Sequence, residues 1–151
     1  MGKTIFFIGD DHDTDGWITT GWESVSKSIG KAPFVLLLEV PFDAKNGITA
    51  EDLDTILEDK PDGKDATTLN AVWHDSYKAY GFDAAGGPTS KKRQDGQAEN
   101  INFFVNSSSQ TKSQTYFVVI VGDYHLQPDG WTPLQQYDYG HDVKTVYAPT
   151  P

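Results

Sequence analysis

Short apolar runs separated by polar, turn-rich segments predict about five strands along the chain. The first run ends at Gly9 and fits a buried strand, and the second is too apolar to leave one of its faces in water. A Ser/Gln/Thr/Lys segment lies between the third and fourth runs, and this arrangement predicts a hairpin in the C-terminal half. The expected strands are residues 5–8, 34–40, 101–105, 116–121 and 143–147.

Apolar side chains at helical spacing predict about three short helices. Thr20 and Thr49 have the spacing of capping boxes and begin the first two, which end before Gly30 and Pro61. A third apolar stripe runs from Leu69 to Tyr80. Residues 84–99 show no periodicity and are expected to form a long mobile loop. Strands and helices in this mixed order favour a single α+β or mixed α/β domain over residues 1–151, with a C-terminal hairpin.

The length of 151 residues suits one domain, which can bury about two-thirds of its unfolded surface without a disulfide or metal. The absence of cysteine excludes a disulfide framework, thiol catalysis and a Cys-ligated zinc site. The N-terminal apolar run is too short for a signal peptide, and no apolar stretch is long enough to span a bilayer. A cytoplasmic location is therefore the default expectation, with a leaderless or mature secreted form as the alternative.

The net charge of −10 argues against nucleic acid or an anionic membrane as the main partner, because both require a basic surface. Of the 22 acidic residues, 17 are Asp and 5 are Glu. Asp favours turns, helix caps and cation ligation, whereas Glu is common on exposed helix faces. The negative charge is therefore expected in loops.

Two segments far apart in the sequence resemble each other. Gly9-Asp10-Asp11-His12 and Gly122-Asp123-Tyr124-His125 both follow an apolar run, and both precede an Asp-Gly-Trp triplet. If the two runs are neighbouring strands, Asp10, His12, Asp123 and His125 converge at one edge of the sheet. Such a set suits Zn²⁺ or another transition metal that activates water in a hydrolase. Strands pointing in opposite directions would remove this site.

The first of these segments also supports a calcium hypothesis. Residues 11–16 match the Asp-x-Asp-x-Asp-Gly opening of a calcium loop. An EF-hand is not expected, because a strand precedes the segment and Trp22, not an acid, occupies the twelfth position of the loop. We expect instead a calcium site of another kind, in a loop that follows a strand. The candidate metal ligands are Asp10, Asp11, His12, Asp13, Asp15, Asp123 and His125.

Aromatic residues interleaved with Asp and Gln in the C-terminal region suit carbohydrate recognition. Aromatic faces stack on sugar rings, while carboxylates and amides hydrogen-bond to hydroxyl groups. Packing of a long loop against the sheet is the alternative for each of these aromatics. The candidate ligand-binding residues are Trp17, Tyr124, Asp129, Trp131, Tyr137, Tyr139 and His141.

Three functions remain open from the sequence. The leading hypothesis is a soluble, non-enzymatic binding module for a glycan or small polar ligand, with Ca²⁺ ordering its acidic loops. The first alternative is the metal-dependent hydrolase with Asp/His ligands, using Zn²⁺ or another transition metal. The second is a structural or protein-interaction protein. The sequence contains no nucleophile elbow, dinucleotide fingerprint or His-Glu-x-x-His motif, and we assign no catalytic residue from it.

Overall fold

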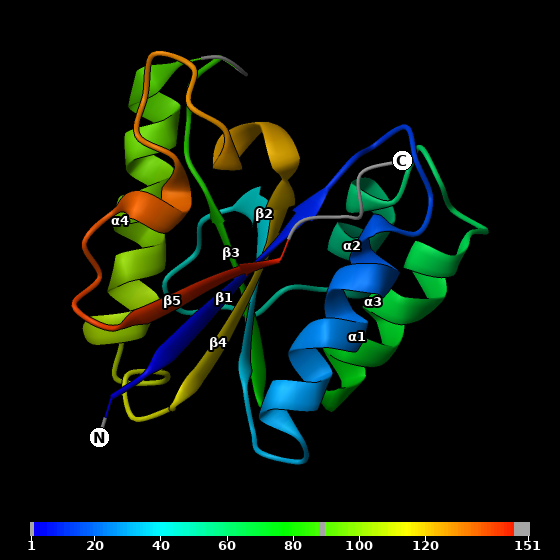
Figure 1. Ribbon diagram of the computed structural model, residues 1–151, viewed down its shortest axis with the longest axis horizontal. Coiled ribbons are helices and arrows are strands. Elements are labelled where there is room, and N and C mark those ends of the chain that lie inside the picture. Colours follow the sequence, from blue (N-terminus) through cyan, green and yellow to red (C-terminus); the bar gives the residue numbers. More distant parts are fainter. Residues whose placement is uncertain (1, 88–89, 147–151) are drawn as a thin grey trace.

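A sheet of five parallel strands forms the centre of the molecule (Figure 1). The computed structural model describes residues 2–87 and 90–146. Its elements, in chain order, are β1 (Thr4–Asp10), α1 (Trp17–Ile29), β2 (Val35–Pro41), α2 (Ala50–Ile56), α3 (Lys64–Asp75), β3 (Lys78–Asp83), α4 (Lys91–Asn106), β4 (Tyr116–Gly122), the 3₁₀ helices η1 (Asp123–Leu126) and η2 (Leu134–Gln136), and β5 (Asp142–Val146).

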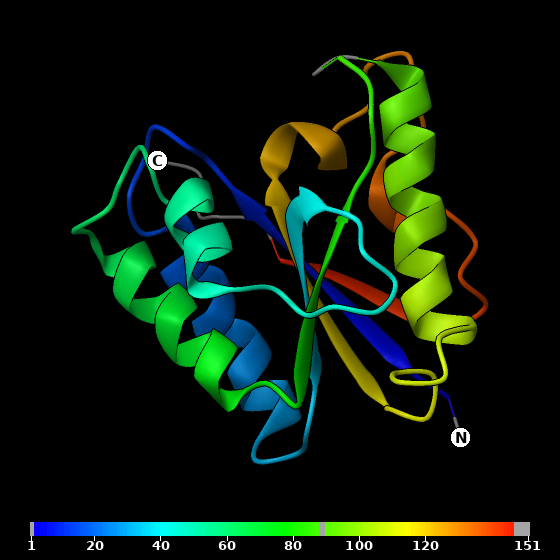
Figure 2. The ribbon, with the colours of Figure 1, turned by 180° about the vertical axis from the view of Figure 1, so that it is seen from behind.

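The strands follow the order β3-β2-β4-β1-β5 across the sheet. The first three helices, α1, α2 and α3, cover one face, and α4 covers the other (Figures 1 and 2). β4 lies between β1 and β2 and pairs in parallel with both. The protein is therefore a mixed α/β single domain of three layers.

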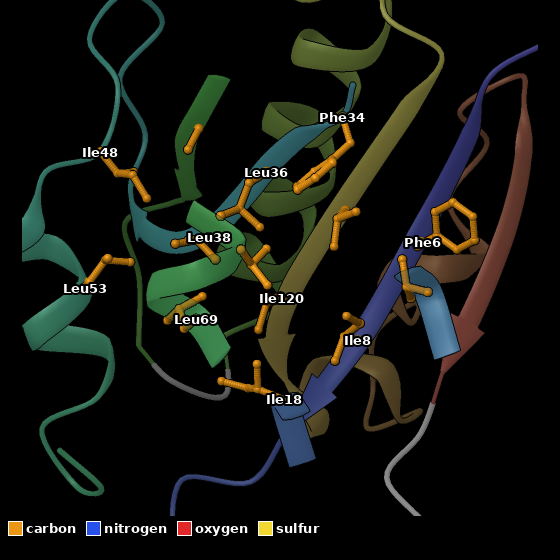
Figure 3. Packing of buried hydrophobic residues seen from close by; sticks show 14 of the residues in the cluster. Phe6, Ile8, Ile18, Phe34, Leu36, Leu38, Ile48, Leu53, Leu69 and Ile120 are labelled. Carbon is orange, nitrogen blue, oxygen red and sulfur yellow. The ribbon is translucent and has the colours of Figure 1, made fainter. Parts of the chain in front are cut away.

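Side chains of each central strand alternate between two cores. In β1, Phe6 and Ile8 face the core shared with α1, α2 and α3, which Figure 3 shows. Ile5 and Phe7 face the core shared with α4. Because helices cover both faces, the strands need apolar residues at every position, which explains runs without polar alternation.

The C-terminal hairpin predicted from the sequence is wrong, because all strands of the sheet are parallel. Residues 101–105, its expected first strand, belong to α4, where Ile101, Phe104 and Val105 are buried at helical spacing. The same helix begins at Lys91, inside the expected loop at 84–99. Its first half buries polar side chains, so a pattern of apolar residues does not reveal it.

The third predicted helix extends too far along the sequence. α3 ends at Asp75, and β3 begins at Lys78 and carries the buried Tyr80. The N–H of Tyr77 donates a hydrogen bond of 2.8 Å to the carbonyl of Phe34, just before β2. Pairing with β2 therefore replaces the last helical turn that the spacing suggests.

Other local predictions are confirmed. The Thr49 side chain accepts a hydrogen bond from the Asp52 N–H, and Asp52 accepts one from the Thr49 N–H, which completes the predicted capping box. The first helix is also present, but the capping box predicted at Thr20 is wrong, because α1 begins at Trp17 after Gly16 and Thr20 lies inside the helix. The final strand is present over Asp142–Val146, and residue 147 of its expected span lies outside the described residues. Among the helices of the described part, none combines the length and apolarity required to cross a membrane.

Candidate active site at the carboxyl edge of the sheet

The two Gly-Asp-x-His segments emerge side by side from the sheet. β1 and β4 are adjacent and parallel, and Asp10 at the end of β1 pairs in register with Gly122 at the end of β4. The chain leaves β1 toward α1 on one face, and leaves β4 toward η2 on the face that α4 covers. Connections that diverge from neighbouring parallel strands leave a crevice at their carboxyl ends, where α/β proteins bind ligands.

A cavity of about 470 Å³ occupies this crevice. A second cavity of about 240 Å³ shares Asp10, His12, Glu39 and Gly122 with it and extends toward the end of α2. The larger cavity is lined by Asp10, Asp11, His12, Asp13, Trp17, Glu39, Arg93, Gly122, Asp123, Tyr124 and His125. The four residues predicted to converge therefore line one cavity.

Two histidines and a carboxylate surround the position that a side chain on Gly122 would occupy. A Cβ atom placed on this glycine would lie 3.5 Å from Glu39 Oε1, 3.6 Å from His12 Nε2 and 3.8 Å from His125 Cδ2. The Gly122 N–H also donates a hydrogen bond of 2.9 Å to Glu39 Oε1. Three groups that can exchange or bind protons therefore surround one point at the end of β4.

His12 lies on the solvent side of this point. Its side chain is 54% exposed, and its Nδ1 atom is 4.0 Å from Oδ2 of Asp10, whose side chain is 3% exposed. The other carboxylate oxygen of Asp10 accepts a hydrogen bond of 2.6 Å from Lys60 Nζ. The Asp10 carboxylate is thus fixed beneath the His12 ring, while the other side of the ring faces the cavity.

His125 lies on the protein side, with a side chain only 7% exposed. Its Nδ1 atom is 2.7 Å from Gln94 Oε1, and its Nε2 atom is 3.3 Å from Glu39 Oε2. The Gln94 amide nitrogen donates to the carbonyls of His125 and Thr132, which directs the amide oxygen toward the ring. The ring also stacks on Trp131, with centroids 5.9 Å apart. These contacts hold His125 in one orientation.

Arg93, from the first turn of α4, joins the ends of β2 and β3. Its Nε and Nη2 atoms donate to the two carboxylate oxygens of Asp83, and Nη2 also donates to Glu39 Oε2, each at 2.9 Å. Gln97 Nε2 donates to Asp83 as well, at 2.9 Å. Among the described residues, none accepts a hydrogen bond from Arg93 Nη1, and Arg93 lines the larger cavity.

The charges of these carboxylates follow from their partners. Burial alone would raise the pKa of Glu39, but hydrogen bonds from His125 and the Gly122 N–H, with the charges of His125 and Arg93, lower this pKa below its ordinary value. Burial likewise opposes the shift at Asp83, where hydrogen bonds from Arg93 and Gln97 lower the pKa. Burial raises the pKa of Asp10, and the contact with Lys60 limits that rise. Glu39 and Asp83 therefore carry full negative charge near neutral pH.

Several predicted calcium ligands are engaged within the protein. Both carboxylate oxygens of Asp15 accept backbone hydrogen bonds, from Lys64 and Asp65, and so cap α3. Asp11 accepts from the Asp13 N–H and from the Thr14 hydroxyl. Within residues 2–87 and 90–146, no group of three or more His, Asp or Glu side chains is arranged to hold a metal ion. Calcium and zinc binding remain predictions from the sequence.

The predicted ligand-binding aromatics divide into two groups. Trp17 and the exposed Tyr124 line the larger cavity, and the Tyr124 hydroxyl contacts the Asp129 carboxylate. Trp131 is buried and packs against His125, and its ring N–H donates to the carbonyl of Gln127. The loop that carries Trp131 therefore packs against His125 of the candidate site.

The remaining members of that set lie away from the cavity. Tyr139 is buried against Phe7, and Tyr137 packs beside it. His141 Nε2 is 2.8 Å from Asn106 Oδ1, and its Nδ1 atom accepts from the Lys3 N–H at the amino end of the sheet. His141 is at the edge opposite the two Gly-Asp-x-His segments, because β5 begins next to the start of β1.

Sequence reasoning missed Glu39, Lys60, Arg93 and Gln94. Glu39 has a signal in the sequence, because it is the single acid within the apolar run 34–40. Arg93 belongs to the Lys91-Lys92-Arg93 triplet and Gln94 follows it, in a segment without visible periodicity. Their importance depends on partners in other segments, which only the fold brings near.

No family model matches the chain, and neither do the curated proteins or the solved structures with which it was compared.

Proposed function

We propose that the protein is a hydrolase whose active site is centred on Gly122, and that it cleaves an uncharged ester or amide. The observation that carries this proposal is the meeting of His12, His125 and Glu39 around Gly122, in one cavity at the end of β4. A cavity containing imidazole and carboxylate groups at a switch point of an α/β sheet is a favourable place for acid–base chemistry.

His12 is the general base in this proposal. Its Nε2 atom faces the space above Gly122, and Asp10 lies on the Nδ1 side, where a carboxylate orients the ring and stabilises the imidazolium. A water molecule in the cavity gives its proton to Nε2 as its oxygen bonds to the carbonyl carbon. His12 then returns the proton to the leaving alcohol or amine as the bond to that group breaks.

Glu39, His125 and Arg93 form the opposing wall. Negative charge develops on the carbonyl oxygen during attack, and N–H donors fixed beforehand stabilise it. In this proposal the Arg93 guanidinium, which lines the cavity, supplies such donors, while Asp83 and Glu39 hold it in place. Glu39 and Gln94 hold His125 beside the same space.

The lining charge favours a substrate without negative charge. The larger cavity is lined by five carboxylates, those of Asp10, Asp11, Asp13, Glu39 and Asp123, and by one guanidinium. Together with the net charge of −10, this lining repels anions such as phosphate esters. The proposal therefore concerns neutral acyl compounds.

Structural observations favour this function over the binding module. Trp131 and Tyr139 are buried and Tyr137 packs beside Tyr139, so only Trp17 and Tyr124 of the predicted aromatic surface line the cavity. Asp15 is occupied as a helix cap. The metal-dependent version of the hydrolase stays a prediction.

The test is hydrolysis of a panel of neutral p-nitrophenyl esters and anilides by the purified protein, after chelator treatment and again with Zn²⁺, Mn²⁺ or Ca²⁺. The variant is His12→Asn, and the matched control is His74→Asn, at the exposed end of α3. We expect His12→Asn to lower the rate at least about 100-fold, because removal of a general base costs 10²–10⁴. Equal rates for His12→Asn and His74→Asn, or no hydrolysis under any condition, would overturn the proposal.

A further inference from the structure

A lysine that touches neither cavity holds the first Gly-Asp-x-His segment in place. Lys60 lies in the turn between α2 and α3, and its side chain is 6% exposed. Its Nζ atom is 2.6 Å from Asp10 Oδ1 and 2.7 Å from Asp65 Oδ2. The same atom donates to the carbonyl of Asp11 at 2.9 Å and of Thr14 at 3.0 Å.

These contacts fix the backbone before and after His12. The carbonyls of Asp11 and Thr14 lie on either side of His12 in the sequence, and the Asp10 carboxylate lies 4.0 Å from the His12 ring. One ammonium group therefore binds the end of β1 and two points of the loop that carries His12. The loop has its own internal hydrogen bonds, from the Asp13 N–H and the Thr14 hydroxyl to Asp11, and Asp15 attaches its far end to α3. Lys60 supplies the attachment on both sides of His12 itself.

The anchor of Lys60 is itself rigid. Asp65 is fully buried in the first turn of α3, and its other carboxylate oxygen accepts hydrogen bonds of 2.9 Å from the N–H and the hydroxyl of Thr19 in α1. Burial alone would lower the pKa of Lys60, but the two carboxylates outweigh it and raise this pKa, so the side chain stays charged. Its three N–H protons are shared among four acceptors, which are thereby held around one charged atom.

We infer that Lys60 is a positioning residue, which holds His12 over Gly122 through Asp10 and the carbonyls of Asp11 and Thr14. The effect on reaction rate rests on the proposed function, because it requires His12 to be the base. Lys60 lines neither cavity, so it acts without contact with substrate. Displacement of a catalytic group by about 1 Å can cost about 100-fold in rate, which is the size of effect that such a residue controls.

The experiment compares Lys60→Met with Val105→Ala. Met keeps the length of the side chain without charge, and Val105→Ala loosens the core on the α4 side, away from the loop. Two quantities are measured: amide hydrogen exchange over residues 11–16, and kcat and KM for the best substrate of the ester and anilide panel. We expect exchange in Lys60→Met to rise at least about tenfold, because the loop opens without global unfolding. We expect kcat to fall about 10–100-fold with little change in KM.

The control and the second variant keep the result decisive. Exchange over residues 11–16 that is the same in Lys60→Met and Val105→Ala would overturn the inference, as would faster exchange with unchanged kcat. If Lys60→Met fails to fold because Asp10 and Asp65 repel each other, the Lys60→Met/Asp65→Asn variant removes that repulsion and undergoes the same test. If the wild-type protein hydrolyses nothing, the proposed function fails, and the exchange measurement alone decides whether Lys60 holds the loop.

Discussion

The two Gly-Asp-x-His segments have nearly the same sequence and opposite structural roles. After β1 the chain forms an exposed loop, so that His12 reaches into the cavity. After β4 the chain turns at once into η1, and His125 is enclosed by Glu39, Gln94 and Trp131. A motif read from the sequence therefore locates the site but does not assign the roles within it.

A shift of one residue in strand register explains part of the difference. Asp10, rather than Gly9, pairs with Gly122, so the two glycines face opposite sides of the sheet. Asp10 consequently points toward Lys60 and the helices of the first face. The Asp123 carboxylate instead lies over Gly9, where a Cβ would approach its Oδ1 atom to 2.6 Å. Asp10 is therefore paired with the Lys60 ammonium group, and Asp123 covers Gly9.

Filling the space between the segments gives the largest expected effect. Gly122→Val places methyl groups where His12, His125 and Glu39 meet, and its backbone, with φ of −52°, accepts any L-residue without strain. We expect hydrolysis to fall at least about 100-fold while the protein stays folded. The control is Gly2→Val, at a glycine with no atom within 4 Å of an added Cβ. Retained activity in Gly122→Val would contradict the location of the site.

The two glycines are also expected to differ in tolerance of a methyl group. In Gly9→Ala the added Cβ meets Asp123 Oδ1 at 2.6 Å, and we expect a loss of about 1–3 kcal/mol in the free energy of unfolding. In Gly122→Ala every contact is at least 3.5 Å, and we expect a change below about 0.5 kcal/mol. Urea denaturation measures both values. Adding Asp123→Ala to Gly9→Ala should restore most of the loss, and no restoration would contradict the assigned contact.

The two histidines should differ in chemical reactivity. His12 is 54% exposed and His125 is 7% exposed, so we expect diethyl pyrocarbonate to modify His12 at least about tenfold faster. Peptide mass spectrometry over time gives both rates in the folded protein. Similar rates would show that the second segment opens as readily as the first.

The smallest expected effect concerns acid stability. Because the pKa of Glu39 is lowered by folding, its ionised form stabilises the protein above its ordinary pKa of 4.5, and this stabilisation is lost as the pH falls through the lowered value. Glu39→Gln removes it, so the free energy of unfolding should decrease less steeply below pH 4.5 than in the wild type. Unfolding curves at several pH values measure the slope, and identical slopes would contradict the charge assigned to Glu39.

The parts of the fold that neighbouring residues determine could be predicted from the sequence. The Thr49 capping box and the apolar runs of β1, β2 and β4 are examples. α4 could not, because Gln94 and Gln97 are buried through hydrogen bonds with His125, Thr132 and Asp83 in distant segments. Apolar periodicity does not record such burial.

The candidate site could be predicted in the same partial way. Asp10, His12, Asp123 and His125 were found because their segments resemble each other, and the adjacency of β1 and β4 confirms that they lie near one another. Glu39 and Arg93 also belong to this site. They are 54 residues apart in the sequence, and a hydrogen bond joins their side chains. Lys60 contacts the loop that carries His12 only because the turn before α3 packs against that loop.

The most direct test of the account is a double-mutant cycle between His12 and Glu39. His12 comes from the loop after β1 and Glu39 from β2, and their side chains meet above Gly122, so they act on the same reacting group. We predict that kcat/KM of His12→Asn/Glu39→Gln is about as low as that of the more damaging single variant, because residues that act as a unit lose their effects together. Losses that multiply, each variant lowering kcat/KM independently of the other, would contradict a single site between the two segments.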